Sequence, residues 1–282
     1  MILWFLMPGF HGAVAAQEPE EEIYRVETRD GNFFTGTILE EDEEKIVLKT
    51  EDFGEVTLRK TNIVKKTKVD PRRLVEGEYW FENPQATRYF WSPNGYGLKK
   101  GEGYYQNVWV LYNQASYGLT DYFSVGAGMV PLFLLGGTST PVWVIPKFSI
   151  PLVDEKVNLG VGLLAGSVIG EDIGGFGIAY FTSTFGNPNT NFTIGTGWGF
   201  ADGEWADLPV ITLSGMFRTG ARGYIITENL IIPAGDDSLL LMAFGGRRII
   251  RNSGLDFGLI IPFAPDMNTF IAIPWLGITF PF

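Results

Sequence analysis

The 282-residue sequence predicts an all-β protein, in which a small β domain precedes an antiparallel transmembrane β-barrel of about twelve strands. Almost every segment after residue 80 alternates apolar residues with small or polar ones, and none shows a helical period. The chain also combines 36 Gly and 15% aromatic residues with only 19% charged residues. A soluble sandwich or lipocalin-like barrel needs a charged outer face, whereas a membrane barrel is apolar toward lipid and polar toward its lumen. The pattern therefore favours the membrane barrel.

Residues 1–16 are an apolar run that ends in small residues and precedes an acidic stretch. This arrangement predicts a secretory signal peptide, cleaved after Ala15 or Ala16, although no Lys or Arg precedes the run. The alternative is a short buried N-terminal segment, because the run is too short to span a bilayer. We therefore expect three parts: a leader (1–16), a small acidic periplasmic β domain with its linker (17–73) and an outer-membrane barrel (74–282).

The acidic domain is predicted from short alternating segments separated by Gly, Asp and Asn turns. Five strands are expected, at residues 23–27, 33–39, 46–49, 56–59 and 63–66. A sheet this short must curl to bury its apolar residues. The basic residues between Lys65 and Arg73 are read either as a solvated face and linker or as a partner site.

The spacing of this domain resembles an Sm-like or SH3-like small barrel. Two glycines, an acid and an apolar pair carry the resemblance: Gly31, Gly36, Asp42, Ile46 and Leu48. Where Sm-like proteins carry an RNA-contacting Asn, this chain has Lys45-Ile46, and where they carry Arg-Gly it has Arg59-Lys60. These departures and the net charge of -11 argue against a nucleic-acid partner.

The barrel strands are read from runs long enough to cross a bilayer, which takes about 9–11 residues in a tilted strand. The expected strands are residues 86–92, 104–117, 121–132, 141–153, 157–169, 175–186, 190–201, 207–218, 222–232, 238–250, 254–263 and 269–282. An even number of strands places both ends of the barrel in the periplasm. Tight polar turns such as 153–156 fit the periplasmic side, and no loop of the opposite set is long enough to form a plug or a lid.

The last strand carries a specific signal, because it ends in Gly-x-x-apolar-x-apolar with Phe as the final residue. Gly277, Phe280 and Phe282 resemble the C-terminal signal by which the outer-membrane assembly machinery recognises its barrels. Pro281 departs from the usual pattern and belongs at a strand end, since it cannot donate to a ladder. The resemblance implies the barrel-assembly machinery and outer-membrane lipid as partners.

Three stretches of the second domain are similar to Bacteroidota-type outer-membrane barrels. They are residues 83–90, 97–107 and 117–126, the last of which resembles a periplasmic-hairpin phrase of such proteins. The resemblance implies location and fold, and it supplies no reaction.

Charged residues inside predicted strands are candidate lumen residues, because an ionisable group at membrane depth must face the interior or be paired. The candidates are Lys147, Arg218, Glu228, Arg247 or Arg248, and Asp256. One hypothesis makes them a constriction that selects solutes by charge. The other, which is slightly favoured, makes them a network that braces a small barrel.

The residue types restrict the chemistry, because the chain has no Cys and its one His, His11, lies in the predicted leader. Thiolate and imidazole catalysis and the corresponding metal sites are thereby set aside, and no motif marks another catalytic group. No enzyme activity, cofactor or metal is expected. The leading function is a channel or transporter for a small solute; the alternative is a membrane anchor whose periplasmic domain binds a protein partner or self-associates.

Overall fold

The computed structural model describes residues 22–76, 78–137, 139–172, 174–235, 237–265, 267 and 269–282. The predicted leader lies outside these residues. The described chain is all-β and falls into two compact units, with the boundary between Tyr79 and Trp80. Short 3-10 helices occur at Lys60–Asn62, Pro71–Arg73 and Leu132–Leu135. In the part of the chain that is described, no helix is long and apolar enough to cross a membrane.

The first unit is built on an antiparallel five-stranded sheet with the order β4-β3-β2-β1-β5. Its strands are β1 (Ile23–Thr28), β2 (Phe33–Glu41), β3 (Lys45–Thr50), β4 (Gly54–Arg59) and β5 (Ile63–Lys68), each within two residues of its predicted range. Alternation along β1, β3 and β4 buries Val26, Ile46, Leu48 and Leu58 in one apolar cluster. The short strands β6 (Leu74–Val75) and β7 (Glu78–Tyr79) pair after the sheet.

Acidic residues at the end of β2 make the stability of this sheet depend on pH. The carboxylate of Glu41 accepts a hydrogen bond from Lys66 at 2.7 Å and pairs with Lys60 at 3.1 Å. Asp42 accepts the backbone N–H groups of Lys45 and Glu44, each at 2.7 Å. The hydrogen bond from Lys66 lowers the pKa of Glu41 below 4.5, and that from Lys45 lowers the pKa of Asp42 below 3.8.

Because both pKa values are lower in the folded chain, these contacts stabilise it above the ordinary values and are lost as the pH falls through the lowered ones. We expect hydrogen-exchange protection of β1–β5 in the full chain, corrected for intrinsic rates, to fall as the pH drops below about 4.5. A variant with Glu41→Gln and Asp42→Asn should show a flatter dependence. An equally steep loss in that variant would contradict the assignment.

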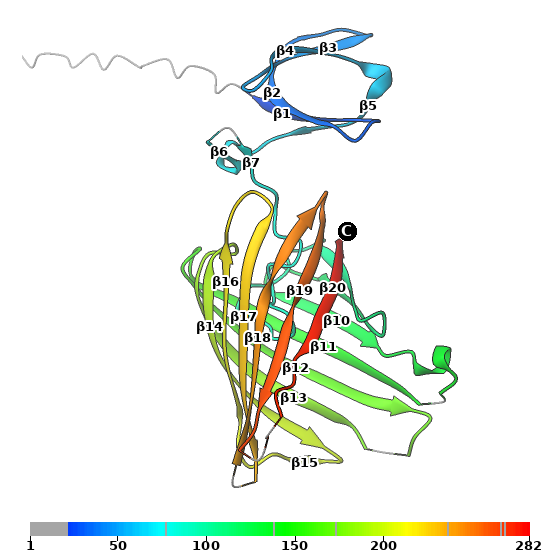
Figure 1. Cartoon of the computed structure of the whole chain (residues 1–282), viewed down its shortest axis with the longest axis vertical. Helices are drawn as coiled ribbons and strands as arrows, with labels where there is room; N and C mark the ends of the chain where they lie inside the picture. The colour runs from blue at the N-terminus through cyan, green and yellow to red at the C-terminus, as the bar shows by residue number, and fades with distance from the viewer. Residues whose placement is uncertain are drawn as a thin grey trace, which may run out of the picture. The chain divides into compact units, whose positions relative to one another are not determined.

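The second unit is a closed antiparallel barrel of twelve strands, seen in Figure 1 as the green-to-red ring. Its strands are β8 (Gly103–Val108), β9 (Tyr112–Gly118), β10 (Phe123–Met129), β11 (Thr140–Val153), β12 (Val157–Ile169), β13 (Phe176–Gly186), β14 (Asn191–Ala201), β16 (Val210–Arg218), β17 (Gly223–Ala234), β18 (Asp237–Ile250), β19 (Ser253–Phe263) and β20 (Ile273–Pro281). The ring closes because β20 pairs with β8 and β13 pairs with β14. The two-residue β15 (Glu204–Trp205) pairs with the end of β14 and lies outside the ring.

The two faces of the wall have opposite character. Along β14, Asn191 and Thr193 are buried inside, whereas Phe192 and Ile194 between them are 42% and 46% exposed. Exposed outward aromatic residues recur on other strands, among them Phe148, Phe181 and Phe257. Apolar residues outside and polar residues inside invert the arrangement of a soluble protein, and they match a barrel whose solvent is lipid.

The predicted strand at residues 86–92 is wrong, although the predicted number of strands agrees with the ring. Residues 86–92 form turns, with an isolated bridge between Arg88 and Pro93. The predicted strand at 104–117 is instead two strands, β8 and β9, joined at Trp109 and Val110 with φ of 51° and 68°. Positive φ is unusual for residues with a Cβ, and hairpin turns of this kind normally carry Gly, Asn or Asp at such positions. Because Trp109 and Val110 occupy them here, the sequence carried no signal for this turn. One strand too many and one too few left the total unchanged.

Residues 81–98, called here the lumen segment, run through the interior of the barrel before β8 begins. Figure 1 shows these residues as thin turns enclosed by the strands. Tyr89, Phe90 and Asn94 are at most 1% exposed. At Gly95 the segment comes so close to β12 that a Cβ would lie 2.3 Å from the carbonyl oxygen of Asn158. No loop between strands was expected to form a plug, and the filling comes instead from the chain before the first barrel strand.

Candidate functional site

The lumen segment has a compact local fold around residues 86–94. The N–H of Tyr89 donates to the carbonyl of Ser92 at 3.0 Å, and that of Asn94 to the carbonyl of Thr87 at 3.1 Å. The amide side chain of Asn94 donates to the carbonyl of Ala86 at 2.8 Å. Turn-forming residues after Trp91, beginning Ser-Pro-Asn-Gly, explain why a segment with aromatic, strand-like composition reverses here.

Glu228 on β17 holds the tip of this turn. One oxygen of its carboxylate accepts three consecutive backbone N–H groups, from Phe90 at 3.0 Å, Trp91 at 2.9 Å and Ser92 at 3.0 Å. The other oxygen accepts the Ser92 hydroxyl at 3.1 Å. Charge-assisted hydrogen bonds are about twice as strong as neutral ones, so this 2%-exposed carboxylate is a principal anchor.

Arg247 on β18 forms the second anchor, together with Asp256 opposite it on β19. Its Nε and Nη2 donate to the two carboxylate oxygens of Asp256 at 2.6 and 2.9 Å. The remaining donors reach the carbonyl of Gln85 at 2.7 Å and that of Tyr89 at 3.1 Å. Asp256 therefore neutralises the guanidinium and orients it toward the lumen segment.

Lys147 and Arg218 bind the segment through neutral groups. Nζ of the buried Lys147 donates to the carbonyls of Thr87 and Tyr96. Arg218, near the end of β16, donates to the carbonyl of Phe81 at 2.7 Å, where the segment enters the barrel, and to that of Ala221 at 2.8 Å. These two predicted lumen residues thus hold the two ends of the segment.

Arg248 does not face the lumen, so Arg247 is the member of this adjacent pair that does. It is exposed, and it lies between the buried Arg247 and Ile249 on β18. Successive strand residues point to opposite faces, so only one of two adjacent arginines can face inward.

The predicted assembly residues lie at the seam that closes the barrel. Gly277 pairs with Val108, and Phe280 stacks on Tyr105 with 6.5 Å between ring centroids. Phe282 exchanges two backbone hydrogen bonds with Gly103, at 2.8 and 3.0 Å. Pro281 is the last residue of β20, at the strand end where a missing N–H is tolerated.

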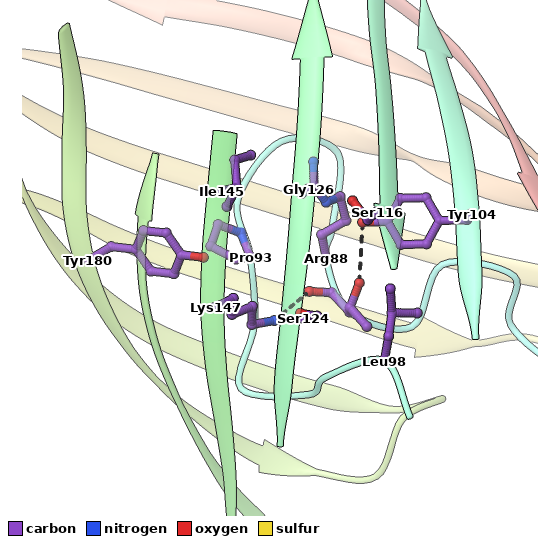
Figure 2. A pocket seen from close by; sticks show the side chains of 11 residues that line it. Arg88, Pro93, Leu98, Tyr104, Ser116, Ser124, Gly126, Ile145, Lys147 and Tyr180 are labelled. Atoms are coloured by element: carbon purple, nitrogen blue, oxygen red, sulfur yellow. Dashed lines mark hydrogen bonds between the residues drawn. The ribbon is translucent and has the colours of Figure 1, made fainter. Parts of the chain in front are cut away.

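Arg88, on the lumen segment itself, was not among the predicted site residues. It is 8% exposed, and two adjoining cavities of about 20 and 130 Å³ both contact it. Tyr104 and Tyr180 point toward it from opposite parts of the wall, as Figure 2 shows around the smaller cavity. The available sequence signal was a lone basic residue inside the run Thr87–Trp91.

The larger cavity shares Arg88, Pro93, Ile145 and Tyr180 with the smaller one and has mostly apolar walls. Its aliphatic lining comes from five strands: Ile145, Leu164, Ile178, Val210 and Leu230. Trp91 and Tyr112 add aromatic surface. Within the described residues, no group of three or more Asp, Glu, His or Cys is placed to hold a metal ion.

Comparison with known proteins adds a structural likeness. No family model matches the chain, and no curated protein matches it. Among solved structures the chain is similar to the KdgM porin in complex with disordered oligogalacturonate, with a TM-score of 0.46 and 8% sequence identity. That likeness covers 64% of this chain and 98% of the other. The ring of twelve strands is established by the pairing within this chain.

Proposed function

We propose that this protein is a channel for a small solute in the outer membrane of a Gram-negative bacterium, closed in this conformation by the lumen segment. The supporting observation is that hydrogen bonds to polar wall residues hold a stretch of main chain inside the barrel. Eight-stranded barrels are just filled by side chains, whereas much larger ones enclose a water channel. Twelve strands leave room for a backbone here, so withdrawal of the segment leaves a polar passage.

The polar groups that would line this passage are already present. Thr182, Thr184, Asn191, Thr193 and Ser214 face inward from neighbouring strands and are at most 3% exposed. Such groups can bond to water or to a hydrophilic solute as readily as to the lumen segment. Because these groups suit a hydrophilic solute once the segment is withdrawn, we favour the channel over a simple anchor.

The same proposal assigns orientation and the role of the first unit. Both barrel ends, Gly103 and Phe282, meet at the rim formed by short turns such as 154–156 and 187–190. Short turns are typical of the periplasmic side. We therefore place residues 22–79 in the periplasm, as an Sm-like or SH3-like domain with the sheet order β4-β3-β2-β1-β5. We also propose that the barrel is related to Bacteroidota-type outer-membrane barrels. Its proposed partners are outer-membrane lipid and the barrel-assembly machinery.

Replacing residues 83–95 of the full chain with a Gly/Ser sequence of equal length tests the channel. We expect sustained conductance in planar lipid bilayers, whereas the unaltered protein conducts only in rare openings. The matched control is a Gly/Ser replacement of residues 203–208, outside the lumen. A folded, heat-modifiable barrel that carries the first replacement and does not conduct would sink the proposal.

A further inference from the structure

The charges inside the barrel are not all matched. Asp256 pairs with Arg247, and the carboxylate of Glu228 is occupied by N–H groups of residues 90–92. In the described part of the chain, no carboxylate lies within ion-pair distance of Arg88 or Lys147. Arg88 donates to the amide oxygen of Gln106 at 3.4 Å, a long contact with a neutral group. A buried cation is costly unless an anion accompanies it.

Unused donors converge where the two cavities meet. Both cavities are lined by Arg88 and Tyr180. Nε of Arg88 and the hydroxyl of Tyr180 are buried and have no hydrogen-bond partner among the described residues. Buried polar groups nearly always have a partner, so two orphaned donors beside one cavity point to a missing acceptor.

The shape and lining of the larger cavity define the rest of the ligand. Its volume of about 130 Å³ is close to that of an engineered apolar cavity, roughly 150 Å³, which binds benzene. Leu164, Ile178 and Val210 offer no hydrogen bonds, which disfavours a sugar or an inorganic anion. Tyr112 and Val210 are the first residues of β9 and β16, so the cavity lies toward the rim opposite the two barrel ends.

We propose that this chamber binds a small organic monoanion, whose carboxylate lies between Arg88 and Tyr180 and whose benzene-sized apolar body fills the cavity beside Trp91. The guanidinium can engage a carboxylate with two parallel N–H donors. The inference names the solute class of the proposed channel and in that respect rests on it, but the binding itself does not require conduction.

Calorimetric titration of the full-length protein in detergent micelles tests this site, with protein-free micelles as the blank. The probes are benzoate, the neutral benzamide and the small anion acetate. We expect benzoate to bind at one site per chain, and benzamide and acetate each to bind at least tenfold more weakly. Equal affinities for benzoate and benzamide would overturn the role of Arg88, and no benzoate binding by a folded barrel would overturn the site.

Variants separate the charge from the cavity. Arg88→Gln should weaken the binding of benzoate at least tenfold and leave the affinity for benzamide unchanged. Leu164→Trp should abolish the binding of both probes, because the larger side chain fills the cavity. If Arg88→Gln does not fold, Tyr180→Phe tests the same position, because it removes only a hydroxyl. It should weaken the binding of benzoate several-fold. Lys100→Gln removes an exposed positive charge outside the cavity and should change nothing. Unchanged benzoate affinity in folded Leu164→Trp protein contradicts the site, whereas binding without conductance contradicts only the channel.

Discussion

Replacing Glu228 with Ala is expected to raise the open probability of the proposed channel about a hundredfold. The substitution leaves the N–H groups of Phe90, Trp91 and Ser92 without their acceptor in the closed conformation. Each unsatisfied buried donor costs about 1–3 kcal/mol, and water entering the vacated space favours the low end. Three donors thus destabilise the closed state by about 3 kcal/mol, and 1.4 kcal/mol is a factor of ten.

Single-channel recording of the full chain measures this effect. Glu228→Gln keeps one acceptor oxygen without the charge, so its open probability should lie between those of the unaltered protein and Glu228→Ala. Glu204→Ala is the matched control, because it removes an exposed carboxylate on β15 and no contact with the lumen segment. A folded Glu228→Ala barrel with the gating of the unaltered protein would show that this carboxylate does not hold the segment.

Asp256→Leu is expected to lower the free energy of unfolding of the barrel by about 3–5 kcal/mol, because it leaves a buried guanidinium without its counter-ion. The pair is 0% and 1% exposed at its side chains, so solvent does not screen it. Arg247→Met should cost a similar amount by stranding Asp256. Removing both charges with Arg247→Met and Asp256→Leu should recover most of the loss, since apolar residues of similar volume often replace a buried pair without penalty.

Urea unfolding of the full chain in lipid vesicles gives the four free energies of this cycle. The double variant should regain stability, but it should conduct more often than the unaltered protein. The reason is that it lacks the hydrogen bonds from Arg247 to the carbonyls of Gln85 and Tyr89, which hold the lumen segment. Arg248→Met on the outer face is the control and should change neither quantity. Strictly additive single substitutions would contradict the coupling of the two charges.

Alternation along the chain was sufficient to predict most of the barrel. From Thr140 to Phe263 the observed strands follow the predicted ones closely, because each inward polar or small residue lies next to an outward apolar one. The same alternation placed Lys147, Glu228 and Asp256 inside, where the structure has them buried. Alternation did not settle which of Arg247 and Arg248 faces inward, because the two charged residues are adjacent and either could take the inward position.

The lumen segment was beyond the reach of this reasoning. Its partners Glu228 and Arg247 lie 136 and 162 positions away from Ser92 and Gln85 in sequence. The hydrophobic period of a short stretch carries no information about contacts between such distant residues. In addition, Ala86–Ser92 has the composition of a strand, which led to the wrong prediction. The hairpin at Trp109 and Val110 was missed for a related reason, since positive φ at these bulky residues is imposed by their neighbours, including the Asn107 side chain that donates to the Val110 carbonyl at 3.1 Å.

By itself the amino-acid sequence determined the solvent of each face of the wall, the approximate positions of most strands and the absence of Cys, because these properties are local or compositional. Only the tertiary structure decided that the lumen is filled, that Glu228 and Arg247 hold the filling, and that Arg88 has no counter-ion among the described residues. The physical reason is that occupancy of the lumen depends on hydrogen bonds between distant residues, which exist only once the ring of strands has closed.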